Sequence, residues 1–154
     1  MTEGFYKSDT FKTFNDDTWT TPRTFFKDLD KEFHFSLDAA ALQSSTLCPD
    51  NWYGPNHPEQ SRQDAFSRDW HRDANGGTVW LNPPYGRTIK SWVAKAQSEA
   101  DKGTTVVLLV PARTDTSWWH DHCIQYEVRF IRGRLKFGDQ KNSAPFPSAV
   151  VVMR

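Results

Sequence analysis

The sequence predicts an α/β protein with a mostly parallel central sheet, helices on both faces and an antiparallel strand pair at its C-terminal end. Short β-branched or aromatic runs alternate with helical patterns, which is typical of parallel strands joined by crossover helices. The run 105–110 is almost wholly apolar, as expected of a strand covered on both faces. With 154 residues the chain suits one domain. We expect a flexible leader over residues 1–18 and a single domain over residues 19–154.

Composition narrows the classes of function. The 19 Lys and Arg balance the 19 Asp and Glu, so any contact with nucleic acid must come from a local basic patch. No apolar run of about 18 residues and no signal-peptide core occurs, which excludes a membrane span and a membrane partner. Two cysteines, Cys48 and Cys123, are too few for a disulfide framework and favour a reducing, cytoplasmic setting. Neither Cys-x-x-Cys nor His-Glu-x-x-His spacing occurs, so we predict no metal site.

The first elements are a helix and a strand. Thr21 suits the N-cap and Pro22 the first position of a helix with one apolar face. The residues of that face are Phe25, Phe26, Leu29 and Phe33. A short strand over residues 34–37 ends at Asp38, and the alanines of 39–42 favour a helical turn.

The middle of the chain predicts loops around one strand. Residues 48–63 are rich in Pro, Asn, Gly and charge, and predict an exposed loop. Residues 64–66 favour a brief strand, 75–77 a turn and 78–81 a buried strand.

The clearest helix spans residues 89–100, with apolar residues at helical spacing and Gly103 as its stop. The remaining elements are a strand over 105–110 ended by Pro111, a short helix over 118–124, a strand over 127–131, and a terminal pair of 133–137 with 148–153. No internal repeat or linker indicates a second domain.

The most informative motif, Asn82-Pro83-Pro84-Tyr85, directly follows the strand over 78–81. The prolines stiffen this corner and lack N–H groups. Asn82 Oδ1 and the Pro83 carbonyl can both accept from one planar –NH2 group, which draws the nitrogen lone pair out of conjugation. Tyr85 offers a flat face on which an extruded base can stack. The motif indicates methyl transfer to a planar amino nitrogen, and an ordinary strand-ending turn is the alternative.

Polar corners follow three predicted strands. Asp38 ends the first, Asn82 the second, and residues 111–115 the third. In open α/β sheets, ligands bind beyond the carboxyl ends of the strands. We therefore expect these corners to lie along one edge of the sheet.

Seven segments of the chain, in this order, resemble those of the small phage-type DNA N6-adenine methyltransferases (Dam). They are 19–22 (WTTP), 37–40 (LDAA), 64–70 (DAFSRDW), 79–86 (VWLNPPYG), 111–116 (PARTDT), 133–137 (GRLKF) and 144–148 (APFPS). The resemblance implies a Rossmann-like methyltransferase fold, S-adenosylmethionine as methyl donor and double-stranded DNA as partner. For a phage-encoded enzyme, it also implies the cytoplasm of the host cell.

The resemblance also implies roles for particular residues. The donor-binding residues would be Thr21, Pro22, Asp38, Ala39, Asp64, Ala65 and Asn82. Asp38 would meet the donor's ammonium or ribose hydroxyls, and Asp64 its adenine amino group. The catalytic corner, which holds the target base, would be Asn82, Pro83, Pro84 and Tyr85. Each donor contact has a plain alternative: Thr21 and Asp38 suit helix caps, and Asp64 suits a turn.

The chain departs from the family in two ways. The donor loop of the family carries glycines for close approach, whereas this chain has alanines at 39–41 and no glycine until Gly54. It is also too short for a separate recognition domain. Recognition would then depend on the loops 53–63, 113–122 and 138–146, or on a second subunit in a homodimer.

A basic stripe is the candidate for contact with the DNA backbone, because such groups neutralise phosphates. It comprises Arg129, Arg132, Arg134, Lys136 and Lys141. An ordinary solvated strand face is the alternative. Phe137 and Phe146 suit either the core or a second face for the base.

These patterns predict a site-specific DNA adenine-N6 methyltransferase that transfers a methyl group from S-adenosylmethionine to a flipped adenine. Other planar –NH2 groups are alternative acceptors: cytosine N4, RNA adenine or protein glutamine. A catalytically inactive nucleic-acid-binding relative is the non-enzymatic alternative.

Overall fold

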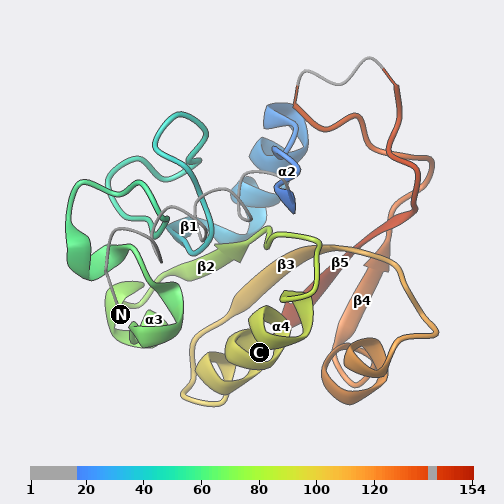
Figure 1. Ribbon diagram of the computed structural model, residues 1–154. Coiled ribbons are helices and arrows are strands. Elements are labelled where there is room, and N and C mark those ends of the chain that lie inside the picture. The colour runs from blue at the N-terminus through green and yellow to red at the C-terminus, as the bar shows by residue number, and fades with distance from the viewer. Residues whose placement is uncertain (1–16, 139–141) are drawn as a thin grey trace.

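The computed structural model describes residues 17–138 and 142–154, with a five-stranded sheet at its centre (Figure 1). The strands are β1 (Phe35–Asp38), β2 (Thr78–Leu81), β3 (Val106–Pro111), β4 (Glu127–Phe130) and β5 (Ser148–Met153), in the spatial order β1-β2-β3-β5-β4. β1, β2 and β3 pair in parallel, whereas β5 runs antiparallel to both β3 and β4. The mixed α/β prediction is confirmed, with parallel pairing in the first half of the sheet.

Helices cover both faces of the sheet, as expected. α4 (Ile89–Ala100) packs on one face and α2 (Arg23–Phe33) on the other. Successive residues of β3 serve these two cores alternately, because side chains of a strand point to opposite faces. Val106, Leu108 and Val110 join the α4 side, while Val107 and Leu109 join the α2 side. All six residues of β3 are buried.

The start of α2 differs from the prediction. Pro22 occupies the N-cap and no side chain caps the helix, so the assignment of Thr21 as N-cap is wrong. The helix ends where His34 adopts the left-handed conformation at φ 54°, with its N–H bonded to the Asp30 carbonyl. Thr21 is thereby left available for a different partner.

Two predictions on the segments next to β1 are wrong. Residues 39–42 form no helical turn, because Ala41 N–H donates to the Tyr53 carbonyl at 2.9 Å. The region 48–63 is not fully exposed either, since residues 52–54 are buried. Backbone pairing beside the sheet outweighs the helix propensity of alanine here.

Short helical turns connect the strands. Residues 64–66 are no strand, because Ala65–Ser67 forms a 3₁₀ turn. A further 3₁₀ turn covers Gln60–Arg62 and a four-residue helix, α3, covers Trp70–Asp73. The short helix expected over 118–124 is a π-helix at Trp119–Cys123.

The C-terminal strand pair has a different member from the one expected. Residues 133–137 are not a strand, and β5 pairs instead with β4, which occupies most of the predicted strand 127–131. Pro111 lies within β3 rather than beyond it. The long segment 131–147 then runs between β4 and β5 without regular structure in its described residues. In the described ranges, no helix has the length and apolar character needed to cross a membrane.

Candidate active site

The Asn82 side chain lies at the carboxyl end of β2, where the sequence places it, and is 6% exposed. Its amide nitrogen donates to the Trp19 carbonyl and, at 2.9 Å, to the Thr21 hydroxyl. Its oxygen, Oδ1, lies 2.7 Å from the Tyr85 hydroxyl. Every polar atom of this amide therefore has a partner, and the side chain is held in one orientation.

Tyr85 is turned inward beside the corner. Its hydroxyl lies 2.7 Å from Asn82 Oδ1 and 2.9 Å from the Leu109 carbonyl, and with one hydrogen it donates to one of them at a time. Burial raises the pKa of Tyr85 well above its ordinary value, so the hydroxyl stays protonated. Its ring meets Phe146 and Phe137 edge-on, at centroid distances of 5.6 and 6.3 Å.

Phe137 and Phe146 belong to an aromatic cluster completed by Trp19 and Tyr85. Trp19 approaches both rings edge-on, at 5.5 Å from Phe137 and 5.1 Å from Phe146. Arg113, at the end of β3, lies over the Phe146 ring at 6.0 Å. The two phenylalanines are thus buried next to Tyr85 rather than in a remote part of the core.

Asp38 ends β1 and is 3% exposed. Oδ2 accepts from Leu47 N–H at 3.0 Å and from the Thr46 hydroxyl at 3.4 Å. Oδ1 is buried with no hydrogen-bond partner among the described residues. Burial raises the pKa of Asp38 to about 7, against the opposing effect of hydrogen bonding from the backbone of Leu47 and Ala40 and from the Thr46 hydroxyl. One carboxyl oxygen is therefore left without a hydrogen bond of normal geometry, although the Ala40 backbone N–H lies close enough to stabilise the charged form.

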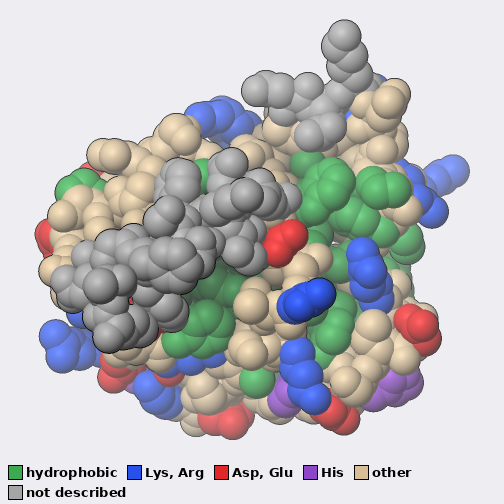
Figure 2. Space-filling view, viewed as in Figure 1, with side chains coloured by type: hydrophobic (Ala, Val, Ile, Leu, Met, Phe, Trp, Pro, Cys, Tyr) green, Lys and Arg blue, Asp and Glu red, His purple; other side chains and the backbone are tan. Residues whose placement is uncertain are grey.

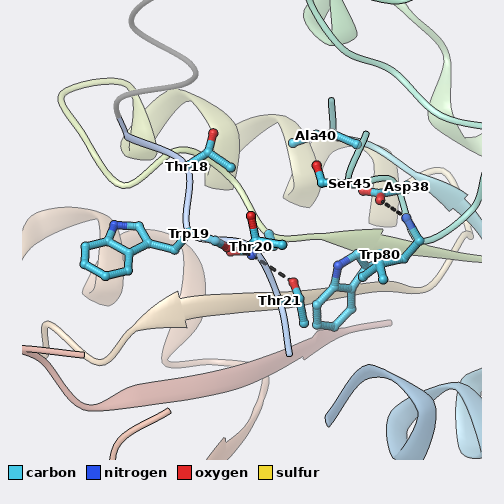
Figure 3. A pocket seen from close by; sticks show the side chains of 11 residues that line it. Thr18, Trp19, Thr20, Thr21, Asp38, Ala40, Ser45 and Trp80 are labelled. Atoms are coloured by element: carbon cyan, nitrogen blue, oxygen red, sulfur yellow. Dashed lines mark hydrogen bonds between the residues drawn. The ribbon is translucent and has the colours of Figure 1, made fainter. Parts of the chain in front are cut away.

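A hollow joins Asp38 and Asn82 (Figure 3). Its lining residues are Thr18, Trp19, Thr20, Thr21, Asp38, Ala40, Ala41, Ser45, Leu47, Trp80 and Asn82. In Figure 3, the Trp19 ring points away from Asp38, while Thr21 and Asp38 approach the hollow from separate segments. The empty volume is about 270 Å³ only when open solvent is included, so the enclosed part is far smaller than a typical ligand pocket.

Other residues implied as donor contacts lie differently. Pro22 caps α2 and Ala39 is fully buried beside Asp38. Asp64 is exposed and accepts from Phe66 N–H at 3.0 Å, which caps the turn that begins at Ala65. Asp64 and Ala65 do not line the hollow. The structure thus brings Thr21, Asp38 and Asn82 together, and leaves the pair at 64–65 apart.

The basic stripe divides into paired and exposed members. Arg129 holds both carboxylate oxygens of Glu32, at 2.6 and 2.7 Å, and also bonds Glu127. The hydrogen bond to Glu32 raises the pKa of Arg129, and it lowers that of Glu32. Arg132, Arg134 and Lys136 are exposed. Lys141 lies outside the described residues.

Figure 2 shows Lys and Arg side chains in separate groups on the visible face, with acidic groups between them. This matches a chain without net charge. No group of three or more His, Cys, Asp or Glu side chains in residues 17–138 and 142–154 is placed to hold a metal ion.

Sequence reasoning missed several residues of the hollow. Thr46 and Leu47 donate hydrogen bonds to Asp38 from a turn. In this turn, the backbone N–H groups of Ser45 and Thr46 both donate to the Leu42 carbonyl. Trp19 contributes its carbonyl rather than its ring. The cluster Ser44-Ser45-Thr46 was the available signal, since such polar runs after a strand are typical of turns.

The fold and site define an α/β protein whose ligand hollow lies at the carboxyl ends of parallel strands, as is general for such sheets. Residues 7–153 match the family model for DNA N-6-adenine-methyltransferase (Dam). The chain therefore belongs to this family, which confirms the resemblance. It is also 30% identical over 104 residues to a DNA N-6-adenine-methyltransferase of Escherichia phage T1. That match covers 67% of this chain and 39% of the relative, so the chain spans about two fifths of its length.

Proposed function

We propose that this protein is a DNA adenine-N6 methyltransferase with a Rossmann-like fold and S-adenosylmethionine as donor. The observation that carries the proposal is the shared hollow: the fixed Asn82 amide and the unpaired oxygen of Asp38 line the same cavity. In the proposed enzyme, Asn82 would face the acceptor amine and Asp38 a polar group of the donor. Family membership supports the choice of DNA adenine as acceptor.

The polar groups of the hollow match a sulfonium nucleoside in chemistry, and the hollow would have to widen to take one. Asp38 Oδ1 lacks a partner among the described residues and would accept from an ammonium or hydroxyl of the donor. Ala40 and Ala41 line the same wall, where small side chains leave room for a ligand. When bound, S-adenosylmethionine supplies an electrophilic methyl group, so the protein's work is mainly to position the acceptor.

Asn82 and the Pro83 carbonyl would orient the adenine N6 toward that methyl group. Asn82 Oδ1 can accept a second hydrogen bond beside the one from Tyr85. The adenine must leave the duplex to reach this corner, at a cost of a few kcal/mol for unstacking. The Tyr85, Phe137 and Phe146 rings lie beside the corner, where a flipped base could stack after they separate.

The test is incubation with radiolabelled S-adenosylmethionine and unmethylated DNA, followed by nucleoside analysis. We expect label in N6-methyladenine. Label in N4-methylcytosine, in RNA or in a protein band would assign one of the other planar amines instead. Absence of donor binding by calorimetry would favour an inactive nucleic-acid-binding relative.

The Asn82→Ala variant tests the role of the corner. We expect turnover to fall by roughly a hundredfold or more, because a positioned polar contact to the reacting group is lost, while donor binding persists. Gln125→Ala is the matched control, since it removes an exposed amide on the π-helix side of the molecule. Equal loss of donor binding and turnover in a folded Asn82→Ala protein would contradict the assignment.

A further inference from the structure

We propose that Thr21, together with the backbone carbonyl of Trp19, is a positioning element that fixes which end of the Asn82 amide faces the acceptor amine. This inference rests on the proposed function. It concerns how the corner obtains its polarity, which the Asn-Pro-Pro-Tyr motif alone does not determine.

The orientation of the Asn82 amide follows from its partners. A carbonyl oxygen can only accept, so the atom facing the Trp19 carbonyl must be the amide nitrogen. The second N–H of the same nitrogen goes to the Thr21 hydroxyl at 2.9 Å. Both donor hydrogens are therefore used by partners within the protein.

This arrangement leaves only an acceptor for the substrate. Oδ1 has two lone pairs and Tyr85 takes at most one of them, so at least one remains for an exocyclic –NH2 group. A flipped amide would present N–H donors to an amine that itself donates, which is the wrong polarity for drawing out its lone pair. Because Thr21 is 5% and Asn82 6% exposed, water is poorly placed to replace the hydroxyl.

The segment that carries Thr21 is attached to the site by other bonds. Tyr85 N–H donates to the Asp17 carbonyl at 3.0 Å, and Gly138 N–H donates to the Thr20 carbonyl at 2.8 Å. At Gly86, an added Cβ would lie 2.1 Å from Asp17 Oδ2, which shows how closely the two segments approach. The two hydrogen bonds use backbone atoms and the Gly86 contact does not involve Thr21, so all three persist when the Thr21 side chain is changed.

The experiment compares Thr21→Val, which keeps the shape and removes the hydroxyl, with Thr21→Ser, which keeps the hydroxyl. For methyl transfer to DNA, we expect kcat to fall about three- to tenfold in Thr21→Val and to recover in Thr21→Ser, as for loss of one hydrogen bond. The donor Kd should change less than twofold in both variants, because Asp38 and the loop 45–47 are untouched.

A readout without turnover uses the NMR signals of the Asn82 side-chain amide, assigned with Asn82→Ala. We expect both N–H protons to exchange slowly in the wild type, and one to exchange faster in Thr21→Val but not in Thr21→Ser. This measurement remains informative if the wild type transfers no methyl group to DNA, an outcome that would reject the proposed function separately.

Three outcomes would overturn the inference. One is an unchanged kcat in Thr21→Val on an active wild-type background. Another is a loss confined to donor Kd and thermal stability, which would make Thr21 only a wall of the hollow. The third is failure of Thr21→Ser to restore kcat and amide protection.

Discussion

A buried carboxyl without full hydrogen bonding resists ionisation, and Asp38 is such a group at the end of β1. Its pKa rises from 3.8 to about 7 because burial disfavours the charged form. Protonated Asp38 thus stabilises the folded state at low pH, and this contribution is lost as pH rises toward 7. A donor bound at Oδ1 would favour the ionised form.

We expect Asp38→Asn to reveal this linkage. The free energy of unfolding of the wild type minus that of the variant should fall between about pH 4 and pH 7, by on the order of 4 kcal/mol, and then stay level. Denaturant titrations of both proteins at several pH values measure the difference. A difference that does not vary with pH would contradict the raised pKa.

Tyr85 offers a second test at the residue scale. Tyr85→Phe keeps the ring but removes the hydroxyl from Asn82 and Leu109, so we expect a stability loss of about 1 kcal/mol with substantial methyl transfer retained. Tyr85→Ala should lose methyl transfer as well, because it removes the stacking surface. Equal activity of these two variants would exclude a role for the ring.

At the residue scale, the sequence predicted which residues belong to the site better than it predicted the partners of those residues. The corner at Asn82 and the acid at Asp38 follow from strand ends, and the structure places both on one hollow. The partners of Asn82 were not predictable, because Trp19 and Thr21 lie 63 and 61 residues away along the chain. No local pattern encodes a pairing over such a separation.

Among the elements, the pairing of 39–41 with 52–54 shapes one wall of the hollow. Gly54 is its closest point, because an added Cβ would lie 1.8 Å from the Ala41 carbonyl. Residues 39–41 are alanines, while the glycine that permits their close backbone approach, Gly54, stands on the opposite segment. The sequence did not predict this close approach of Gly54 to Ala41.

We expect Gly54→Ala to destabilise the protein by about 3 kcal/mol or more and to weaken donor binding, because a backbone atom must shift. Gly76→Ala is the control: Gly76 has φ +84° and open space around it, so only about 1 kcal/mol of backbone strain is expected. Thermal unfolding and donor calorimetry measure both effects. Equal losses in the two variants would show that steric contact at Gly54 is unimportant.

Two other elements show why strand prediction from the local sequence pattern failed. Asp64 suggested a strand, yet its side chain caps a 3₁₀ turn, which is the ordinary use of such a residue. Residues 133–137 alternate basic and apolar side chains like a strand, but β5 already has β3 and β4 as its two neighbours. Strand pairing was decided by the rest of the sheet.

Across the whole molecule, zero net charge means that any binding to DNA would have to come from a few exposed cations. We propose Arg132, Arg134 and Lys136 for this role, since Arg129 is occupied by Glu32 and Glu127. The paired arginine joins the edge strand β4 to the end of α2, which is a structural task.

Replacing Arg132, Arg134 and Lys136 together by Ala should make the slope of log binding constant against log salt less steep by about 2 to 3. Fluorescence anisotropy with duplex DNA at several salt concentrations measures it. Arg129→Ala serves as control, with a loss of stability and little change in slope. A slope unchanged in the triple variant would locate the DNA contact elsewhere.

The order of the sheet was the least predictable feature of the whole molecule. Alternating strands and helices predicted the class, but nothing in residues 148–153 shows that they insert between β3 and β4. Such an insertion pairs segments that are far apart in sequence, and it depends on β3 and β4 as neighbours on either side.

The position of β5 also bears on when the protein can fold. A ribosome makes residues 148–153 after β3 and β4, yet β4 has its only sheet neighbour in β5 among the described residues. Until β5 emerges from the exit tunnel, β3 and β4 have no strand between them. This part of the sheet therefore forms only after β4 has been made, and strand edges stay open in the nascent chain until then.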